Sequence, residues 1–386
     1  MKTDFLIIGG GIAGASIAYH LADLHAVIVL EAESQPGYHT TGRSAAFYAE
    51  SYGGSAIRSL TSASKEFLLD PPRDFAAQPI LTKRGALHIF TEAEEKQALK
   101  TAADAQKAHI PVTVITREDA ISMQPLLQQA DFKGALFDQD CGDLDVASLH
   151  QAYLSGLKKR GGQIVTSCSL QTAHYDLGRQ NKGQQNLGQW SIQTNTGPIT
   201  ARVIVNTAGA WADEVAEKSG VKPLGVQPLR RTVLTTHVKN DTENPPPNTP
   251  LTLRYNESLY FKPESGQTLI CPEDETPSPP CDAQPELEDI ALALHRFEQF
   301  TGYQPARPTA TWAGLRTFAK DRAPIIGFDD QCPGFFWNIG QGGYGIQTCP
   351  AWSLVAATLA TGQDIPENLK QFGCRARDYA PARLKP

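Results

Sequence analysis

The sequence predicts an α/β fold in which a nucleotide-binding layer is interrupted by a sheet-rich insertion. Three observations lead to this prediction. The first 31 residues contain a strand, a glycine-rich turn, a helix and a second strand. Further along the chain, helical and strand-like segments alternate, and strand-like segments prevail between residues 202 and 318. The 386 residues are enough for one large domain or two interleaved domains.

The amino-terminal unit has the clearest periodicity. Residues 4–8 are an apolar strand, and residues 12–24 place Ile12, Ile17, Ala18 and Leu21 at the spacing of one helix face. Residues 26–30 are again continuously apolar and rich in β-branched side chains. Such a run is typical of a strand that is buried on both faces.

The turn inside this unit has the glycine pattern of a dinucleotide site. Gly9 permits a tight turn, Gly11 lets the backbone approach a pyrophosphate, and Gly14 lets the helix pack on the strand. The first amides of the helix are free to bind the anion. Glu31 ends the second strand, where its carboxylate can accept hydrogen bonds from ribose hydroxyls. The complete turn consists of Gly9, Gly10, Gly11, Ile12, Ala13 and Gly14.

This pattern alone also occurs in turns that bind nothing. Here the strand, the turn, the helix and the terminal acid coincide, which favours a bound dinucleotide. Glu31 would repel the 2′-phosphate of NADP, but it does not separate FAD from NAD.

The remaining elements follow from periodicity and turn residues. Helices are predicted over residues 56–69, 92–108 and 146–160, the last with Asp145 as its N-cap. Strands are predicted over residues 86–90, 112–115, 202–205, 231–238 and 311–318, and residues 259–269 form a hairpin that turns through Glu264, Ser265 and Gly266. Three polar runs, 178–188, 240–250 and 273–286, are predicted to be surface loops.

Composition and charge exclude several classes of function. A net charge of -6 and a pI near 5.9 give no general attraction to nucleic acid. The seven cysteines are odd in number and form no Cys/His cluster, which indicates reduced thiols and no metal site. We expect no leader peptide and no transmembrane segment, so the expected location is the cytoplasm, with peripheral docking at the inner membrane as an open alternative.

Five segments, in order along almost the whole chain, carry a family resemblance: GYHTTGRSAA, VNTAGAWADEVAEKSGVKPLGVQPLRRT, ESLYFKP, TWAGLRTF and GFFWNIGQGGYGIQT. They resemble the flavoprotein family of D-amino-acid oxidases, glycine oxidases and sarcosine oxidases, and within it the bacterial D-arginine dehydrogenases. The resemblance implies a Rossmann-like FAD-binding domain (1–84, 142–219 and 318–386) with an interleaved mixed-sheet α+β substrate domain (85–141 and 220–317).

The resemblance also implies which residues contact FAD. The small side chains of residues 42–46 would let amides approach the cofactor, with Arg43 and Ser44 at the pyrophosphate; a polar surface loop is the alternative. The glycine-rich turn after residue 339 leads into a helix whose N-terminus would stabilise negative charge on the flavin. The implied contacts are Gly42, Arg43, Ser44, Ala45, Ala46, Gly209, Gly342, Gly343, Tyr344, Gly345 and Ile346. No cysteine lies near TWAGLRTF, so the FAD is expected to be non-covalent.

At the substrate end, Arg316 matches the family arginine that clamps a carboxylate, and Arg231 and Tyr260 match two further substrate contacts. Tyr52 matches a lid tyrosine that shields the flavin face. An ordinary surface ion pair is the alternative for either arginine. No general base is assigned, because hydride transfer can start from a neutral amine.

Two departures from the D-arginine dehydrogenase pattern concern the substrate side chain. Ala86 stands where that pattern has a glutamate, and Phe47 stands where it has a histidine. With Ile346, these residues predict a more apolar pocket and an uncharged or hydrophobic D-amino acid. Glu50 could replace the missing carboxylate if it turned inward, whereas a solvated position is commoner for a glutamate on a loop.

The predicted function is FAD-dependent oxidation of a D-amino acid to an imino acid, which water converts to a 2-oxo acid and ammonia. Two alternatives stay open within the family: oxidation of glycine or an N-methylated amino acid, and dehydrogenation of a 2-hydroxy acid. A third alternative is a flavin-binding protein without turnover. The electron acceptor of the enzyme would be a quinone, an electron-transfer protein or oxygen.

Overall fold

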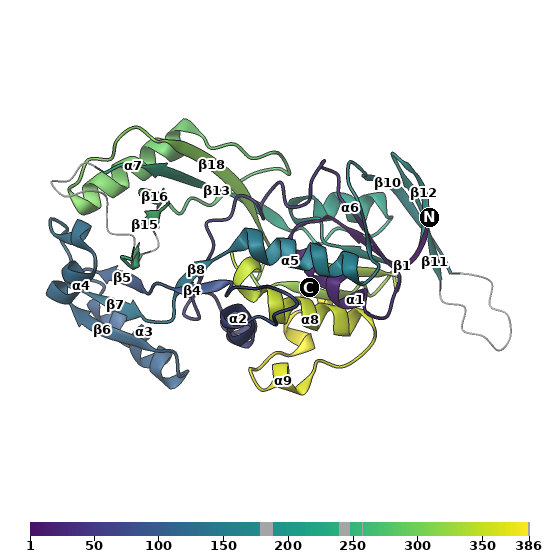
Figure 1. The fold of residues 1–386 in the computed structure, drawn as a ribbon, viewed down its shortest axis with the longest axis horizontal. Coiled ribbons are helices and arrows are strands. Elements are labelled where there is room, and N and C mark those ends of the chain that lie inside the picture. The colour runs from purple at the N-terminus through teal and green to yellow at the C-terminus, as the bar shows by residue number, and fades with distance from the viewer. Residues whose placement is uncertain (178–187, 239–247, 257, 385–386) are drawn as a thin grey trace.

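The structure is a computed structural model that describes residues 1–177, 188–238, 248–256 and 258–384. The described residues form two large sheets and one small sheet. The two large sheets lie towards opposite ends of the long axis of the molecule (Figure 1).

The eight-stranded sheet contains the amino-terminal unit. Its parallel strands are, in spatial order, β9 (Gln163–Val165), β2 (Val27–Leu30), β1 (Lys2–Ile8), β12 (Gly197–Asn206) and β20 (Phe335–Ile339). Its antiparallel strands are β10 (Leu170–Asp176), β11 (Gln189–Thr194) and β19 (Ile325–Phe328). On one edge of β12, the first half pairs with β11 and the second half pairs with β20. The predicted α/β fold is confirmed.

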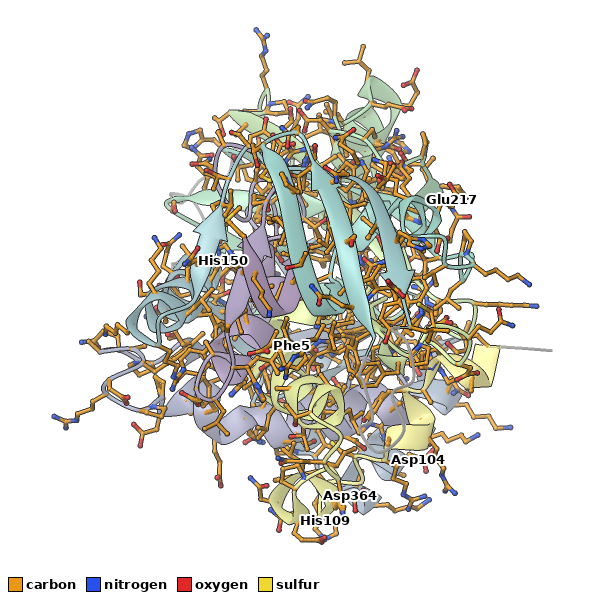
Figure 2. The ribbon with its side chains drawn as sticks, turned by 90° about the vertical axis from the view of Figure 1, so that its right-hand side faces the viewer. Phe5, Asp104, His109, His150, Glu217 and Asp364 are labelled. Atoms are coloured by element: carbon orange, nitrogen blue, oxygen red, sulfur yellow. The ribbon has the colours of Figure 1, made fainter. Side chains whose placement is uncertain are left out.

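Helices cover both faces of this sheet, as a buried parallel strand requires. Phe5 and Ile7 of β1 belong to a core with α1 (Ile12–Leu21), α2 (Ser55–Leu69), α5 (Val146–Lys159) and α8 (Gly345–Ala360). Leu6 and Ile8 point to the other face, where α6 (Ala212–Lys218) and strands β10 and β11 pack. Figure 2 turns this sheet towards the viewer and labels Phe5.

The nine-stranded sheet is mainly antiparallel and is built from the middle of the chain. Its order is β17 (Thr276–Pro277), β13 (Gln227–Thr236), β16 (Gln267–Cys271), β15 (Tyr260–Glu264), β14 (Leu251–Arg254), β5 (Ala86–Phe90), β7 (Gly134–Asp138) and β6 (Val112–Thr116). β18 (Ala310–Phe318) pairs with the free edge of β13.

The two faces of the nine-stranded sheet have different neighbours. Leu87, Phe261 and Ile270 pack under α4 (Arg117–Met123) and α7 (Leu287–Thr301). Because side chains alternate along a strand, Val233 and Tyr260 point to the opposite face. That face is turned towards the turns of the eight-stranded sheet and is covered at its far end by α3 (Glu95–Lys107).

A three-stranded sheet lies in the connection between the two large ones. It contains β3 (Phe47–Tyr48), β8 (Gly142–Leu144) and β4 (Leu81–Lys83). The remaining helical segments are α9 (Glu367–Lys370), η1 (Pro125–Leu127), η2 (Gly209–Trp211), η3 (Ala376–Asp378) and η4 (Pro381–Leu384).

The predicted elements lie close to the observed ones. Asp145 caps α5 by accepting a hydrogen bond from the amide of Ser148 at 2.8 Å. The predicted hairpin forms as β15 and β16, with Ser265 and Gly266 at positive φ in its turn. The first helix is shorter than predicted and ends at Leu21.

One loop prediction is partly wrong. Residues 273–286 contain strand β17, which pairs with β13, and the buried Ala283, while Glu275, Thr276 and Pro277 are exposed as predicted. The other two predicted loops, 178–188 and 240–250, lie mostly outside the described residues. The five-segment division into domains stays a prediction.

Candidate active site

One cavity of about 750 Å³ runs from the turns of the eight-stranded sheet to the inner face of the nine-stranded sheet. Its volume is in the range of ligand sites. Of the site residues predicted from sequence, all but Gly14, Gly42 and Tyr344 line this cavity. The folding of the chain therefore brings together segments that lie as far apart in sequence as Gly9 and Ile346.

The glycine-rich turn between β1 and α1 forms one wall. Gly9 has φ +108°, and a Cβ on it would lie 2.8 Å from the carbonyl oxygen of Thr207. A Cβ on Gly14 would lie 1.9 Å from the carbonyl oxygen of Gly9. Gly14 therefore allows α1 to pack on the turn, and it does so from outside the cavity.

Glu31 holds this turn and also faces the cavity. Its Oε2 accepts a hydrogen bond from the amide of Gly10 at 2.9 Å, and its Oε1 accepts one from the amide of Glu33 at 2.9 Å. A carboxylate has about four acceptor positions. Two of them therefore stay available to hydroxyls of a ligand.

Three side chains that sequence reasoning missed position the same turn. Thr41 Oγ1 accepts a hydrogen bond from the amide of Ile12 at 3.0 Å, and the Thr207 hydroxyl donates to the start of the turn, with the carbonyl oxygens of Ile8 at 2.8 Å and of Gly9 at 3.0 Å. Nε2 of the buried His150 lies 2.8 Å from the Gly10 carbonyl oxygen, which only accepts. His150 is therefore protonated on Nε2, and burial lowers its pKa, so the ring is neutral. Figure 2 labels His150.

The segment 40–46 forms the next part of the wall. Thr40 Oγ1 donates to the carbonyl of Leu315 at 2.8 Å. The Arg43 guanidinium donates to the carbonyl of Ala283 at 2.7 Å and forms an ion pair with Asp282. These contacts bind the segment to β18 and to the loop before α7. Gly42 lies behind the wall, where a Cβ would be 2.6 Å from the carbonyl oxygen of Gly37.

The turn between β20 and α8 closes the cavity on the opposite side. Gly342 has φ +53°, and a Cβ there would lie 2.1 Å from the ring of Phe318. A Cβ on Gly343 would lie 2.0 Å from Arg316 Nη2. Gly345 and Ile346 line the cavity at the start of α8, so the amides of its first turn open on it.

Arg316 and Arg231 lie at the substrate end of the cavity. The pairing of β13 and β18 sets Arg231 opposite Gly314, with Arg316 two positions further along β18 on the same face. Arg316 Nη2 donates to the hydroxyl of Tyr52 at 2.8 Å. Arg231 Nε donates to the carbonyl of Asp274 at 2.8 Å. Both guanidinium groups are largely buried, so neither forms the ordinary surface ion pair of the alternative prediction.

Aromatic side chains surround these arginines. The Tyr260 ring packs edge-on against Phe47 with centroids 5.7 Å apart, and Tyr52 packs on Tyr344 at 4.9 Å. Burial raises the pKa of Tyr260 well above its ordinary value, so its hydroxyl keeps its proton. Burial, followed by the neighbouring Tyr52, raises the pKa of Tyr344 to about 12.

Glu275 is a further acidic side chain beside the arginines, and sequence reasoning placed it in a surface loop. Its Oε1 lies 3.4 Å from Arg231 Nη2, 3.4 Å from Arg316 Nη1 and 2.8 Å from Arg322 Nη2. Burial alone would raise the pKa of Glu275, but the arginines lower it below the ordinary value.

Neither position proposed for Glu50 is correct. The residue is buried, does not line the cavity and accepts a hydrogen bond from Lys65 Nζ at 3.0 Å. The loop turns Glu50 towards α2 because Lys65 on that helix provides a counter-ion. Ala86 is fully buried and lies behind the cavity wall.

The cavity continues past the arginines along the inner face of the nine-stranded sheet. Leu253 of β14, His88 of β5 and Leu136 of β7 line this part, and Ala105 of α3 lies at its end. We call it the α3 groove. Leu253, Leu136 and Ala105 are apolar.

The described residues contain neither a metal-binding cluster nor a membrane-spanning helix. No group of three or more His, Cys, Asp or Glu side chains in that part of the chain could hold a metal ion. None of its helices is both long and apolar enough to span a bilayer. The seven cysteines are free thiols.

Comparison with known proteins gave a family model and several full-length relatives. The model described as DAO, FAD dependent oxidoreductase, matches residues 4–359. Glycine oxidase of Geobacillus kaustophilus (strain HTA426) is 24% identical over 394 residues, which cover 96% of this chain and 96% of that protein.

Two solved structures are similar over nearly their whole length. The crystal structure of glycine oxidase from Geobacillus kaustophilus has a TM-score of 0.79 at 22% identity and covers 96% of this chain and 98% of that one. That of L-proline dehydrogenase from P. horikoshii has a TM-score of 0.78 at 21% identity and covers 99% and 98%. At this identity the likeness shows a common fold.

Proposed function

This chain belongs to the DAO family of FAD-dependent oxidoreductases, and from this premise we propose that it oxidises a D-amino acid to an imino acid. Water would then convert the imino acid to a 2-oxo acid and ammonia. The observation that carries the proposal is the pair of buried arginines, Arg231 and Arg316, in the cavity that begins at the dinucleotide turn.

The residues of the cavity fit FAD. Gly209 has φ +55°, and a Cβ on it would meet no atom within 4 Å, so the position leaves open space for a ligand. α1 and α8 both begin at the cavity, so their first amides can bind the pyrophosphate and the pyrimidine edge of the flavin. This geometry supports the predicted cofactor contacts of the residues that line the cavity, and not those of Gly14, Gly42 and Tyr344.

Bound FAD supplies the acceptor for the hydride that leaves the α-carbon of the substrate. The chain's own contribution is to hold that carbon in place. Arg316 and Arg231 would bind the substrate carboxylate through charge-assisted hydrogen bonds, and the neutral Tyr260 hydroxyl would donate a third. Tyr52 would release its bond to Arg316 when substrate enters and then exclude water.

The walls beyond the arginines favour an uncharged side chain. Phe47 and Leu253 line this part of the cavity, whereas Ala86 and Glu50 do not. Within the described residues, Glu273 is the carboxylate that lines the substrate end, and its charge acts on Arg231. A guanidinium on the substrate would therefore have no dedicated partner in the α3 groove. We propose a neutral D-amino acid, and not D-arginine, as the preferred substrate.

Anaerobic mixing tests the proposal. The holoenzyme is mixed with D- and L-amino acids, glycine, sarcosine and 2-hydroxy acids, and bleaching of the flavin absorption is recorded. Neutral D-amino acids such as D-Met, D-Leu and D-Phe should reduce the flavin fastest. Faster reduction by D-Arg would contradict the side-chain argument, and no reduction by any D-amino acid would contradict the proposed function.

The relatives' names support one second candidate. Glycine oxidase and L-proline dehydrogenase act on glycine and on a cyclic secondary amine, so glycine or an N-substituted amino acid is the alternative substrate. The apolar lining of the α3 groove beyond the arginines favours a larger side chain. The electron acceptor is identified by comparing peroxide formation with the reduction of a quinone or dye.

A further inference from the structure

Two buried guanidinium groups need a counter-ion before any substrate arrives. Glu275 provides it, because its Oε1 is within 3.4 Å of both Arg231 Nη2 and Arg316 Nη1. A carboxylate of the chain thus lies against the two arginines that the proposed function assigns to the substrate carboxylate.

Arg322 holds the same carboxylate from the solvent side. Its Nη2 lies 2.8 Å from Oε1 and its Nη1 lies 3.1 Å from Oε2 of Glu275, which is the two-point geometry of a strong pair. The Arg322 side chain is 45% exposed, and the Arg231 side chain is 14% exposed. The strongest contact of Glu275 is therefore with the arginine outside the pocket.

The backbone around Glu275 is anchored independently of its side chain. The Asp274 carbonyl accepts from Arg231 Nε at 2.8 Å, and the Asp274 carboxylate accepts from the Thr232 amide at 2.8 Å. The Glu275 side chain is 35% exposed. Its carboxylate can thus turn away from Arg231 and Arg316 without breaking these backbone contacts.

From this geometry we infer that Glu275 is a built-in competitor for the substrate carboxylate. Glu275 does not itself line the cavity, so an arriving carboxylate binds Arg231 and Arg316 from the cavity side, Glu275 gives up its bonds to them, and Arg322 retains it. The inference rests on the carboxylate role of the two arginines in the proposed function. Such competition would make the site selective for carboxylates, because a ligand that lacks a negative charge cannot replace Glu275 on the two arginines.

The variant Glu275→Gln tests this inference in the FAD holoenzyme. Benzoate is used as the probe carboxylate and benzamide as its neutral counterpart, and binding is followed by the change in flavin absorption. Removing the competing charge should lower the Kd for benzoate about three- to tenfold. The decrease in Kd is smaller than for a fully buried ion pair, because Glu275 is partly exposed to solvent. The Kd for benzamide should change much less.

Two further variants keep the test specific. Glu367→Gln removes an exposed carboxylate that pairs with Lys370 on α9, and it should leave benzoate binding unchanged. Arg322→Ala removes the retaining group, so benzoate should bind more weakly, and adding Glu275→Gln should abolish that loss. Thermal stability and FAD content control for misfolding.

The possible results of the benzoate experiment distinguish a failure of the inference about Glu275 from a failure of the proposed function. If the wild type binds benzoate and Glu275→Gln binds it equally or more weakly, Glu275 is not a competitor, while the carboxylate clamp remains. If neither protein binds benzoate, the clamp and the inference both fail.

Discussion

The arginine on β18 is the residue on which substrate binding depends most. Arg316 is held by the Tyr52 hydroxyl and fills the space that the missing Cβ of Gly343 leaves. Both contacts orient the guanidinium before substrate binds. A shorter, single-point cation at this position cannot reproduce the planar fork.

We predict that Arg316→Lys lowers kcat/KM for the preferred amino acid about 100-fold, since two charge-assisted hydrogen bonds are lost or displaced. Stopped-flow flavin reduction measures the effect. Arg307→Lys, on an exposed connection, is the matched control and should behave as the wild type. An unchanged kcat/KM in Arg316→Lys would remove this residue from the carboxylate site.

His150 acts at the other end of the cavity through the backbone. Replacing it by Leu leaves the Gly10 carbonyl without its buried donor, which should weaken FAD binding about tenfold. Titration of the apoprotein with FAD, followed by fluorescence, gives the Kd. His150→Gln keeps a donor and should recover part of the affinity; equal losses in both variants would indicate a packing effect only.

At the residue scale, sequence predicts positions that have their own local signature. The glycines and Glu31 could be predicted because strand, turn and helix spacing restricts them to one chemistry. Thr41, His150 and Glu275 have no such signature, since their partners are distant in sequence and are chosen by tertiary packing. Glu50 shows the same limit, because its partner Lys65 lies on another element.

Helix α3 determines how far the cavity extends from the arginines. Ala98 and Ala102 pack it on the sheet, and Ala105 leaves room at the end of the α3 groove. A long unbranched side chain could occupy this space. Each buried methylene would then improve kcat/KM roughly threefold to fourfold.

In a series of substrates from D-2-aminobutyrate to D-2-aminooctanoate, kcat/KM of the wild type should therefore rise with the length of the side chain. Ala105→Phe should abolish this rise and leave kcat/KM for the shortest substrate unaffected. Flavin reduction rates over the series measure this. Ala105→Leu is a milder block if the larger ring disturbs the helix, and Gln106→Phe on the exposed side of α3 is the control. A wild-type rate that is independent of length would show that substrates do not enter the α3 groove.

At the element scale, segments with strong periodicity or turn chemistry were predictable. The first βαβ unit, the Asp145 cap and the hairpin at Ser265 and Gly266 all have such signals. β10 and β11 were missed because their outward residues are polar and they flank a polar run. The short β17 forms because it pairs with the edge of β13, and no pattern in its own sequence predicts this pairing.

The stability of the whole molecule includes a contribution from ion pairs that join its separate sheets. Asp140, just after β7, binds Lys65 of α2 and Lys83 of β4, each at 2.6 Å. Burial opposes ionisation of Asp140, but the two lysines lower its pKa below the ordinary value. These two ion pairs therefore stabilise the fold at pH values above the pKa of Asp140 in the unfolded chain. Their contribution is lost as the pH falls through the lower pKa of Asp140 in the folded protein.

Asp140→Asn should lower the melting temperature at pH 7 by about 2–4 °C, and the difference should vanish in acid, where the wild type has also lost the charge. Melting curves between pH 3 and pH 8 measure it. Asp104→Asn, which removes an exposed pair with Lys107, should change little at any pH. A difference that persists at pH 3 would show that the loss is steric.

The order of strands in the eight-stranded sheet has a consequence for synthesis on the ribosome. β1 pairs with β2 early, but β20 and α8, which complete the cavity, are encoded after residue 334 of 386. The nascent chain can therefore fold its first βαβ unit long before the flavin side of the pocket exists. A pocket with both of its walls therefore exists only after α8 has been made, so FAD can bind fully only after this helix has joined the fold.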